Sequence, residues 1–170
     1  RRAAARVAAP GARASAAGVR TVLNPAPIAF DYNGLWPAVD IAVVNEVESA
    51  CLTGEGDPSA AADALRRKGV GTVVTTLGPK GAQLVDGEGE RHVPAPQVEA
   101  VDTTGAGDVF CGVLAAAVQA ALDWDAALRW AVASASLSVT RRGTASAFPS
   151  ADELLRLRRQ ALTGPGRARW

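Results

Sequence analysis

Residues 102–112 read Asp-Thr-Thr-Gly-Ala-Gly-Asp-Val-Phe-Cys-Gly, and this stretch is the most informative part of the chain. Three small residues, Gly105 to Gly107, separate Asp102 from Asp108, and a long apolar run follows the second carboxylate. Small residues let the backbone turn tightly and bring its N–H groups close to a ligand. A helix that starts there adds unpaired N–H groups and the positive end of its dipole, which attract phosphate. The stretch therefore predicts a phosphate-binding turn at the start of a helix.

Asp108 needs a chemical reason to stand at such a turn. A carboxylate repels a phosphate beside it, so its presence is costly unless it has a task. Taking the proton from a hydroxyl that attacks the phosphate is such a task. We therefore expect Asp108 to be a general base. The alternative is that Asp108 caps the helix, a position where Asp is favoured, and the two roles are compatible.

Four further segments carry short motifs that follow β-like or helical runs. They are Asn24-Pro25-Ala26-Pro27, Asn45-Glu46-Val47-Glu48, Thr75-Thr76-Leu77-Gly78-Pro79-Lys80-Gly81 and Val139-Thr140-Arg141-Arg142-Gly143. Together with the block at 102–108, they are similar in order and spacing to the motifs of the ribokinase family, also called the phosphofructokinase B family of carbohydrate kinases. The resemblance covers about residues 18–160. The Asn-Pro-Ala-Pro element points to the ribokinase branch rather than to fructokinases or adenosine kinases.

The resemblance implies an enzyme that transfers the γ-phosphoryl group of ATP to a sugar hydroxyl. The reaction that it favours first is the conversion of D-ribose to ribose 5-phosphate. Asp108 would be the base, and the N–H groups of Gly105, Ala106 and Gly107 would stabilise the charge on the transferred group. The resemblance also implies a cytoplasmic location and a homodimer for the full-length parent.

The resemblance further assigns residues to the nucleotide and to Mg²⁺. Asn45 and Glu48 are three residues apart, which places them on one face of a helix's first turn. Glu48 would act on Mg²⁺ through water, because this ion keeps much of its hydration shell. Thr76, Gly78 and Gly81 follow a strand, where ligands of open α/β sheets bind, and would line the nucleotide. The alternatives are helix capping by Asn45 with a solvated Glu48, and an ordinary turn at the strand exit.

A monovalent cation, usually K⁺, is the third cofactor that the resemblance implies. Its oxygen ligands would come from Asp102 and Thr104 and from carbonyl groups near Ser138, Arg141 and Gly143. The family often adds a hydroxyl a few residues later, where this chain has Ala147 with Ser146 before it. The alternative is that Asp102 only caps its own loop.

Apolar and turn-forming residues alternate along the chain in a pattern typical of an α/β fold. We expect strands near 20–23, 39–44 and 71–76, a hairpin from 82–86 and 90–93, and helices at 46–53, 58–68, 105–121 and 124–140. A capping box, Ser150-Ala151-Asp152-Glu153, opens a last helix to about Ala161. The strands predict a mostly parallel, doubly wound sheet. The resemblance makes this a three-layer α/β/α sandwich whose N-terminal half and β lid are missing.

The same reading divides the chain into three parts. Residues 1–17 would be a partial helix or tail, 18–162 the nucleotide-binding and catalytic part, and 163–170 a tail. The chain has 170 residues and no methionine, so position 1 is not an encoded start and a fragment is expected.

Composition narrows the class of protein further. A net charge of +1 gives no electrostatic case for nucleic acid or an anionic membrane. The apolar run from Val109 to Leu122 is too short to span a bilayer. Two distant cysteines suggest a reducing compartment, and we expect both in the core.

Two other functions stay open. The acceptor could be another sugar or a nucleoside, such as fructose, 2-keto-3-deoxygluconate or adenosine. The chain could instead be an inactive nucleotide-binding remnant, because the sugar-binding residues of the family lie mainly in the missing half.

Overall fold

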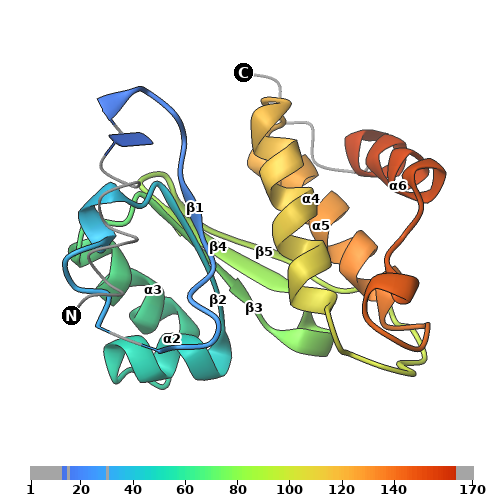
Figure 1. The fold of residues 1–170 in the computed structure, drawn as a ribbon, viewed down its shortest axis with the longest axis horizontal. Coiled ribbons are helices and arrows are strands. Elements are labelled where there is room, and N and C mark those ends of the chain that lie inside the picture. The colour runs from blue at the N-terminus through green and yellow to red at the C-terminus, as the bar shows by residue number, and fades with distance from the viewer. Residues whose placement is uncertain (1–12, 15, 30, 164–170) are drawn as a thin grey trace. The chain divides into compact units, whose positions relative to one another are not determined.

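A computed structural model describes residues 13–14, 16–29 and 31–163 of the chain (Figure 1). The chain divides into two compact units. The first comprises Arg1–Leu77 and Gln83–His92, and the second comprises Gly78–Ala82 and Val93–Trp170.

A five-stranded sheet forms the centre of the first unit. Its strands follow chain order: β1 (Val22–Leu23), β2 (Ile41–Asn45), β3 (Thr72–Thr76), β4 (Ala82–Asp86) and β5 (Gly89–Val93). β1 pairs with β2, and β2 with β3, in parallel. The expected strands and hairpin are thus confirmed. The first strand is shorter than the sequence predicts.

β1 is held at its ends by side chains. The backbone N–H of Thr21 donates to Asp40 Oδ2 (2.6 Å), and the Thr21 hydroxyl donates to the carbonyl of Ala38 (2.8 Å). After β1, Asn24 Nδ2 donates to the carbonyl of Val43 in β2 (2.9 Å). The Asn24 side chain therefore fixes the strand exit.

Two helices of the first unit pack against each other and against the sheet: α2 (Glu46–Thr53) and α3 (Pro58–Arg67). Asp57 caps α3 by accepting from the N–H of Ala60 (2.9 Å), and Pro58 occupies the first turn, where its missing N–H is not needed. The buried residues of α3 recur at helical spacing: Ala61, Ala62 and Leu65. Ala62 and Leu65 join an apolar core with residues of β2 and β3. Cys51 on α2 is exposed, so its expected place in the core is wrong.

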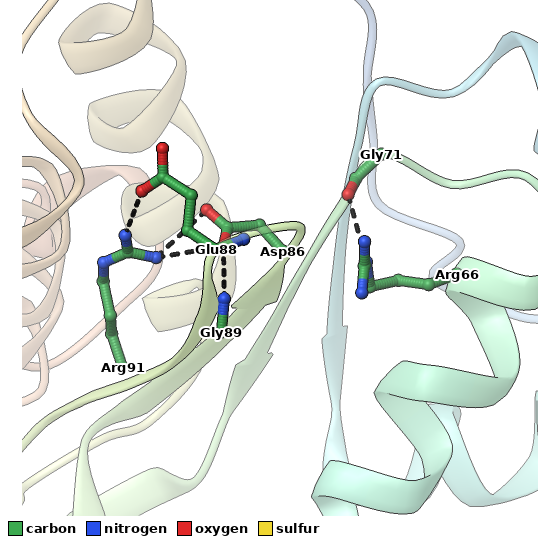
Figure 2. Close-up of polar contacts among 6 residues, drawn as sticks. All are labelled: Arg66, Gly71, Asp86, Glu88, Gly89 and Arg91. Atoms are coloured by element: carbon green, nitrogen blue, oxygen red, sulfur yellow. Dashed lines mark hydrogen bonds and ion pairs between the residues drawn. The ribbon is translucent and has the colours of Figure 1, made fainter.

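The hairpin of β4 and β5 is stabilised by one buried carboxylate, that of Asp86 (Figure 2). Asp86 Oδ1 accepts from the N–H groups of Glu88 (2.9 Å) and Gly89 (3.2 Å), and both oxygens accept from Arg91. Arg91 also pairs with Glu88 (2.6 Å). Figure 2 also shows Arg66 of α3 donating to the carbonyl of Gly71, just before β3 (3.3 Å). These groups therefore have a structural role.

The second unit is mainly helical: α4 (Ala106–Gln119), α5 (Trp124–Ser138) and α6 (Ala151–Thr163). α5 packs against both α4 and α6. The expected capping box of α6 is confirmed, because Ser150 N–H donates to Glu153 Oε2 (2.9 Å) and Glu153 N–H donates to Ser150 Oγ (3.4 Å). Trp130 of α5 is buried and donates to the carbonyl of Leu154 (3.0 Å), as expected for a packing residue.

The expected terminal segments are only partly covered by the structure. Arg13, Ala14 and Ala16 are helical, and Gly18 follows with φ +69°, as expected for a helix stop. Residues 1–12, 15 and 164–170 lie outside the described residues. In the part of the chain that the structure describes, no helix combines the length and apolar character needed to cross a bilayer.

Candidate active site

The turn predicted to bind phosphate is the start of α4. Gly105 is the N-cap residue, with left-handed backbone angles (φ +79°, ψ 0°), and no side chain caps the helix. The N–H of Ala106 donates back to the carbonyl of Thr103 (3.3 Å). The next N–H groups belong to the first turn, where a helix offers no internal acceptor. Their free donors and the positive end of the helix dipole fit an anion such as phosphate.

Asp108 is in the first turn of α4, two residues after its first residue. Since Gly105 is the N-cap, the alternative in which Asp108 caps the helix is wrong. Its side chain is exposed and, among the described residues, takes part in no ion pair or hydrogen bond. The carboxylate is therefore free to accept a proton from an incoming hydroxyl.

Asp102 ties the turn to the segment after α5. Its Oδ1 accepts from the N–H of Thr104 (2.9 Å), and its Oδ2 accepts from the N–H of Gly143 (3.0 Å). The pKa of Asp102 lies below its ordinary value, mainly because of the hydrogen bond from Thr104 and also because of the one from Gly143. The loop-capping alternative for Asp102 is thus observed, and it is compatible with a cation nearby.

The other residues expected at the cation are near the end of α5. Ser138 is buried, and its carbonyl already accepts from the N–H of Arg141 (3.1 Å). The guanidinium of Arg141 pairs with Glu153 of α6 (2.5 Å), so only its backbone could serve a cation. Gly143 presents its N–H to Asp102. The hydroxyl of Ser146 donates to the carbonyl of Arg142 (3.3 Å), and Ala147 is buried.

Asn45 and Glu48 form a reciprocal capping box at the start of α2. Asn45 Oδ1 accepts from the N–H of Glu48 (2.8 Å), and Glu48 Oε2 accepts from the N–H of Asn45 (2.9 Å). Thr76 is the direct parallel partner of Asn45 in the sheet. The three residues therefore share the carboxyl edge of β2 and β3. One oxygen of Glu48 is engaged in the cap, which leaves Oε1 for a water or a hydrated ion.

Gly78 begins a single 3₁₀ turn, Gly78–Lys80, and Gly81 follows it. Both have positive φ, and the N–H of Gly81 donates to the carbonyl of Gly78 (3.0 Å). A Cβ on Gly81 would overlap the carbonyl oxygen of Val93, so this glycine is required by the packing of its own chain. Beside Gly78 the space is open, and a ligand could approach its backbone.

Sequence reasoning missed two side chains near the turn. An ideal Cβ on Gly105 would stand 2.9 Å from Thr144 Cγ2 and 3.1 Å from Phe148 Cε1. Both residues come from the segment between α5 and α6, about 40 positions further along the chain. Neither belongs to a motif, and no spacing in the sequence signals the contact.

The fold is an α/β fold of the ribokinase type. The model of the pfkB family carbohydrate kinases matches residues 4–151. The chain belongs to this family.

Similar proteins carry related names. The chain is 39% identical over 142 residues to a deoxyribokinase of Salmonella typhi, and the match covers 80% of this chain and 46% of the relative. It is 38% identical over 143 residues to a ribokinase of Haemophilus influenzae, and that match covers 81% of this chain and 47% of the relative. The chain therefore spans about half the length of these relatives.

A solved structure confirms the fold class. Arabidopsis thaliana ribokinase, complexed with ribose and ATP, superposes with a TM-score of 0.80 at 31% identity. The match covers 87% of this chain and 50% of the plant protein. The described chain is thus part of a ribokinase-like α/β domain.

Proposed function

We propose that this chain is the nucleotide-binding and catalytic part of a kinase that phosphorylates a sugar hydroxyl with ATP, with D-ribose as the first-choice acceptor. One observation carries the proposal. The first turn of α4 has no side-chain cap, and the Asp108 carboxylate stands exposed within it. Donors for a phosphoryl group and an acceptor for a proton are thus built into the same turn.

The reaction follows from these groups. The sugar oxygen forms a bond to the γ-phosphorus while the bond to the leaving oxygen of ADP breaks. Asp108 takes the proton of the hydroxyl as that bond forms, a contribution typically of roughly 10²–10⁴-fold. The N–H groups of Gly105, Ala106 and Gly107 would offset the charge on the transferred group, and the N–H of Ala106 would be shared with the carbonyl of Thr103. Donors of this kind contribute about 3–4 kcal/mol each when well aimed.

The cofactors of the proposal are ATP, Mg²⁺ and K⁺. Asn45, Thr76, Gly78 and Gly81 would contact the nucleotide, and Glu48 would hold water of the Mg²⁺ shell with its free oxygen. Asp102 and the backbone of Thr104, Ser138, Arg141 and Gly143 would serve K⁺, which supplies positive charge near the turn. Asp102 fits a cation because its carboxylate supplies negatively charged oxygen ligands.

The setting of the enzyme is part of the same proposal. A cytoplasmic location is proposed from the family resemblance and from the two widely separated cysteines of the sequence, which suggest a reducing compartment. A homodimer is proposed for the full-length protein from the family resemblance alone.

The identity of the acceptor sugar is proposed from the relatives. Names of relatives at 38–39% identity favour ribose or deoxyribose over fructose, 2-keto-3-deoxygluconate and adenosine. A second candidate function is nucleotide binding without catalysis. It is favoured by the coverage, because the chain matches only about half of each relative.

ADP release in the protein's natural full-length context tests the proposal. We expect ADP to appear with ATP, Mg²⁺ and ribose or deoxyribose, and much more slowly with the other three acceptors. ATP binding without ADP release for any acceptor would establish the second candidate and reject the first.

A further inference from the structure

The segment between α5 and α6 lies against the loop that leads into α4. The carbonyl of Val139 accepts from the N–H groups of Val101 (2.7 Å) and Asp102 (3.1 Å). Asp102 in turn accepts from Gly143 (3.0 Å). Three hydrogen bonds therefore fix the segment and the loop relative to each other, over a separation of about 40 positions in sequence.

Beyond these bonds, the segment fills the space beside Gly105. The Thr144 methyl and the Phe148 ring lie where a side chain on residue 105 would stand. They therefore border its Cα from one side. Gly105 is the residue whose left-handed angles turn the chain into α4. Contacts at this point constrain the direction in which the following N–H groups point.

The backbone at Phe148 is fixed by its surroundings. Its neighbours Ala147 and Pro149 are buried, and its N–H donates to the carbonyl of Ala145 (3.4 Å). Phe148 is 39% exposed, so its packing beside Gly105 is the contact on which a role for its ring depends. This contact points to a role at the turn.

We propose that Phe148 and Thr144 are positioning residues for phosphoryl transfer, because their contact with Gly105 sets the orientation of the N–H groups of residues 105–107. This inference rests on the proposed function of that turn. Neither side chain touches the reacting atoms in this account. Both act through the backbone of Gly105.

Four variants of the full-length protein test the inference. Phe148→Ala removes the ring, and Phe148→Leu keeps apolar bulk beside Gly105. Thr144→Ser removes the methyl, and Thr144→Val keeps it. Leu155→Ala on α6 is the matched control, because Leu155 is also a large apolar side chain that is about half exposed (51%).

We expect Phe148→Ala to lower kcat at least 10-fold with the KM for ATP within about threefold of wild type. Phe148→Leu should recover most of the loss, Thr144→Ser should lose more activity than Thr144→Val, and Leu155→Ala should match wild type. A loss of kcat in Phe148→Ala no larger than that in Leu155→Ala, or no recovery by leucine, would overturn the inference.

A second readout separates this inference from the proposed function. Amide hydrogen exchange of residues 105–109 should be faster in Phe148→Ala than in wild type, and unchanged in Leu155→Ala. A wild-type protein that turns over no acceptor would reject the proposed function, and the exchange rates would still decide the positioning role. Unchanged exchange in Phe148→Ala would reject that role.

Discussion

At the scale of the residue, Gly105 is the position where two independent restrictions meet. Its φ of +79° lies in the region that L side chains rarely adopt, and the space beside its Cα is occupied by Thr144 and Phe148. The sequence predicts a tight turn there because of its small residues. It cannot show that a distant segment also excludes a side chain, because that contact depends on how α5 and α6 are connected.

Replacing Gly105 should therefore be costly. We expect Gly105→Ala to lower the free energy of unfolding by about 1–3 kcal/mol, because the left-handed backbone is strained for alanine and the Cβ meets Phe148. Gly112→Ala is the matched control. Gly112 is inside the same helix and has open space beside it. Gly112→Ala should raise the free energy of unfolding by about 1 kcal/mol. Denaturant unfolding measures both, and equal stabilities for the two variants would refute this view of Gly105.

Asp108 shows how far residue-level reasoning reached. It lies exposed in the first turn of α4, and its role as a general base stays a prediction. The alternative of an N-cap was wrong because the cap is Gly105, which has no side chain to accept a hydrogen bond. Choosing between adjacent cap positions requires backbone angles.

At the scale of the element, α2 and α3 begin with similar caps but differ in what the cap could serve. Asn45 and Glu48 cap α2 reciprocally, and Asp57 caps α3. The sequence placed both starts correctly because Asn and Asp are favoured there. It left open whether Asn45 and Glu48 cap the helix or serve Mg²⁺. The geometry shows the cap, and it leaves one Glu48 oxygen for the proposed ion.

Cap removal separates stability from function. We expect Asn45→Ala and Asp57→Ala each to lower stability by about 0.5–2 kcal/mol, because each leaves an N–H of the first turn without its acceptor. Only Asn45→Ala should also raise the Mg²⁺ concentration needed for half-maximal activity, since it releases Glu48. Thermal unfolding and Mg²⁺ titrations of ADP release measure the two effects. Equal Mg²⁺ dependence in both variants would remove the metal role.

The ion pair between α5 and α6 makes a prediction about acid. The hydrogen bonds from Arg141, and next in size the one from the Ser150 N–H, lower the pKa of Glu153 from 4.5 to about 2. A carboxyl group whose pKa is lower in the folded state stabilises that state above its ordinary pKa, and the contribution declines as the pH falls from about 4.5 to about 2.

Glu153→Gln should thus be less stable than wild type at pH 7, with the difference shrinking below pH about 4.5 and gone near pH 2. Circular dichroism melts across this range measure it. Asp152→Asn, at the neighbouring first-turn carboxylate, should track wild type. A Glu153→Gln deficit that stays constant with pH would show that the ion pair does not cause it.

At the scale of the whole molecule, the fold was largely predictable and the site only in part. The segments of β2 and β3 lack a polar face, which predicted buried parallel strands. Capping residues and glycines marked most helix ends. The exposure of Cys51 was missed because a short helix has too few residues to define its buried face. The hydrogen bond from the Gly143 N–H to Asp102 links positions 41 apart, a contact that local sequence patterns do not encode.

The measurement that tests the central claim most directly is the turnover of Asp108→Asn in the full-length protein. We predict that kcat with ribose or deoxyribose falls at least ~10²-fold while ATP affinity changes little, since the amide is isosteric but cannot take the proton. Asp125→Asn, which removes a first-turn carboxylate from α5, should retain normal turnover. Near-normal turnover in Asp108→Asn would contradict the account.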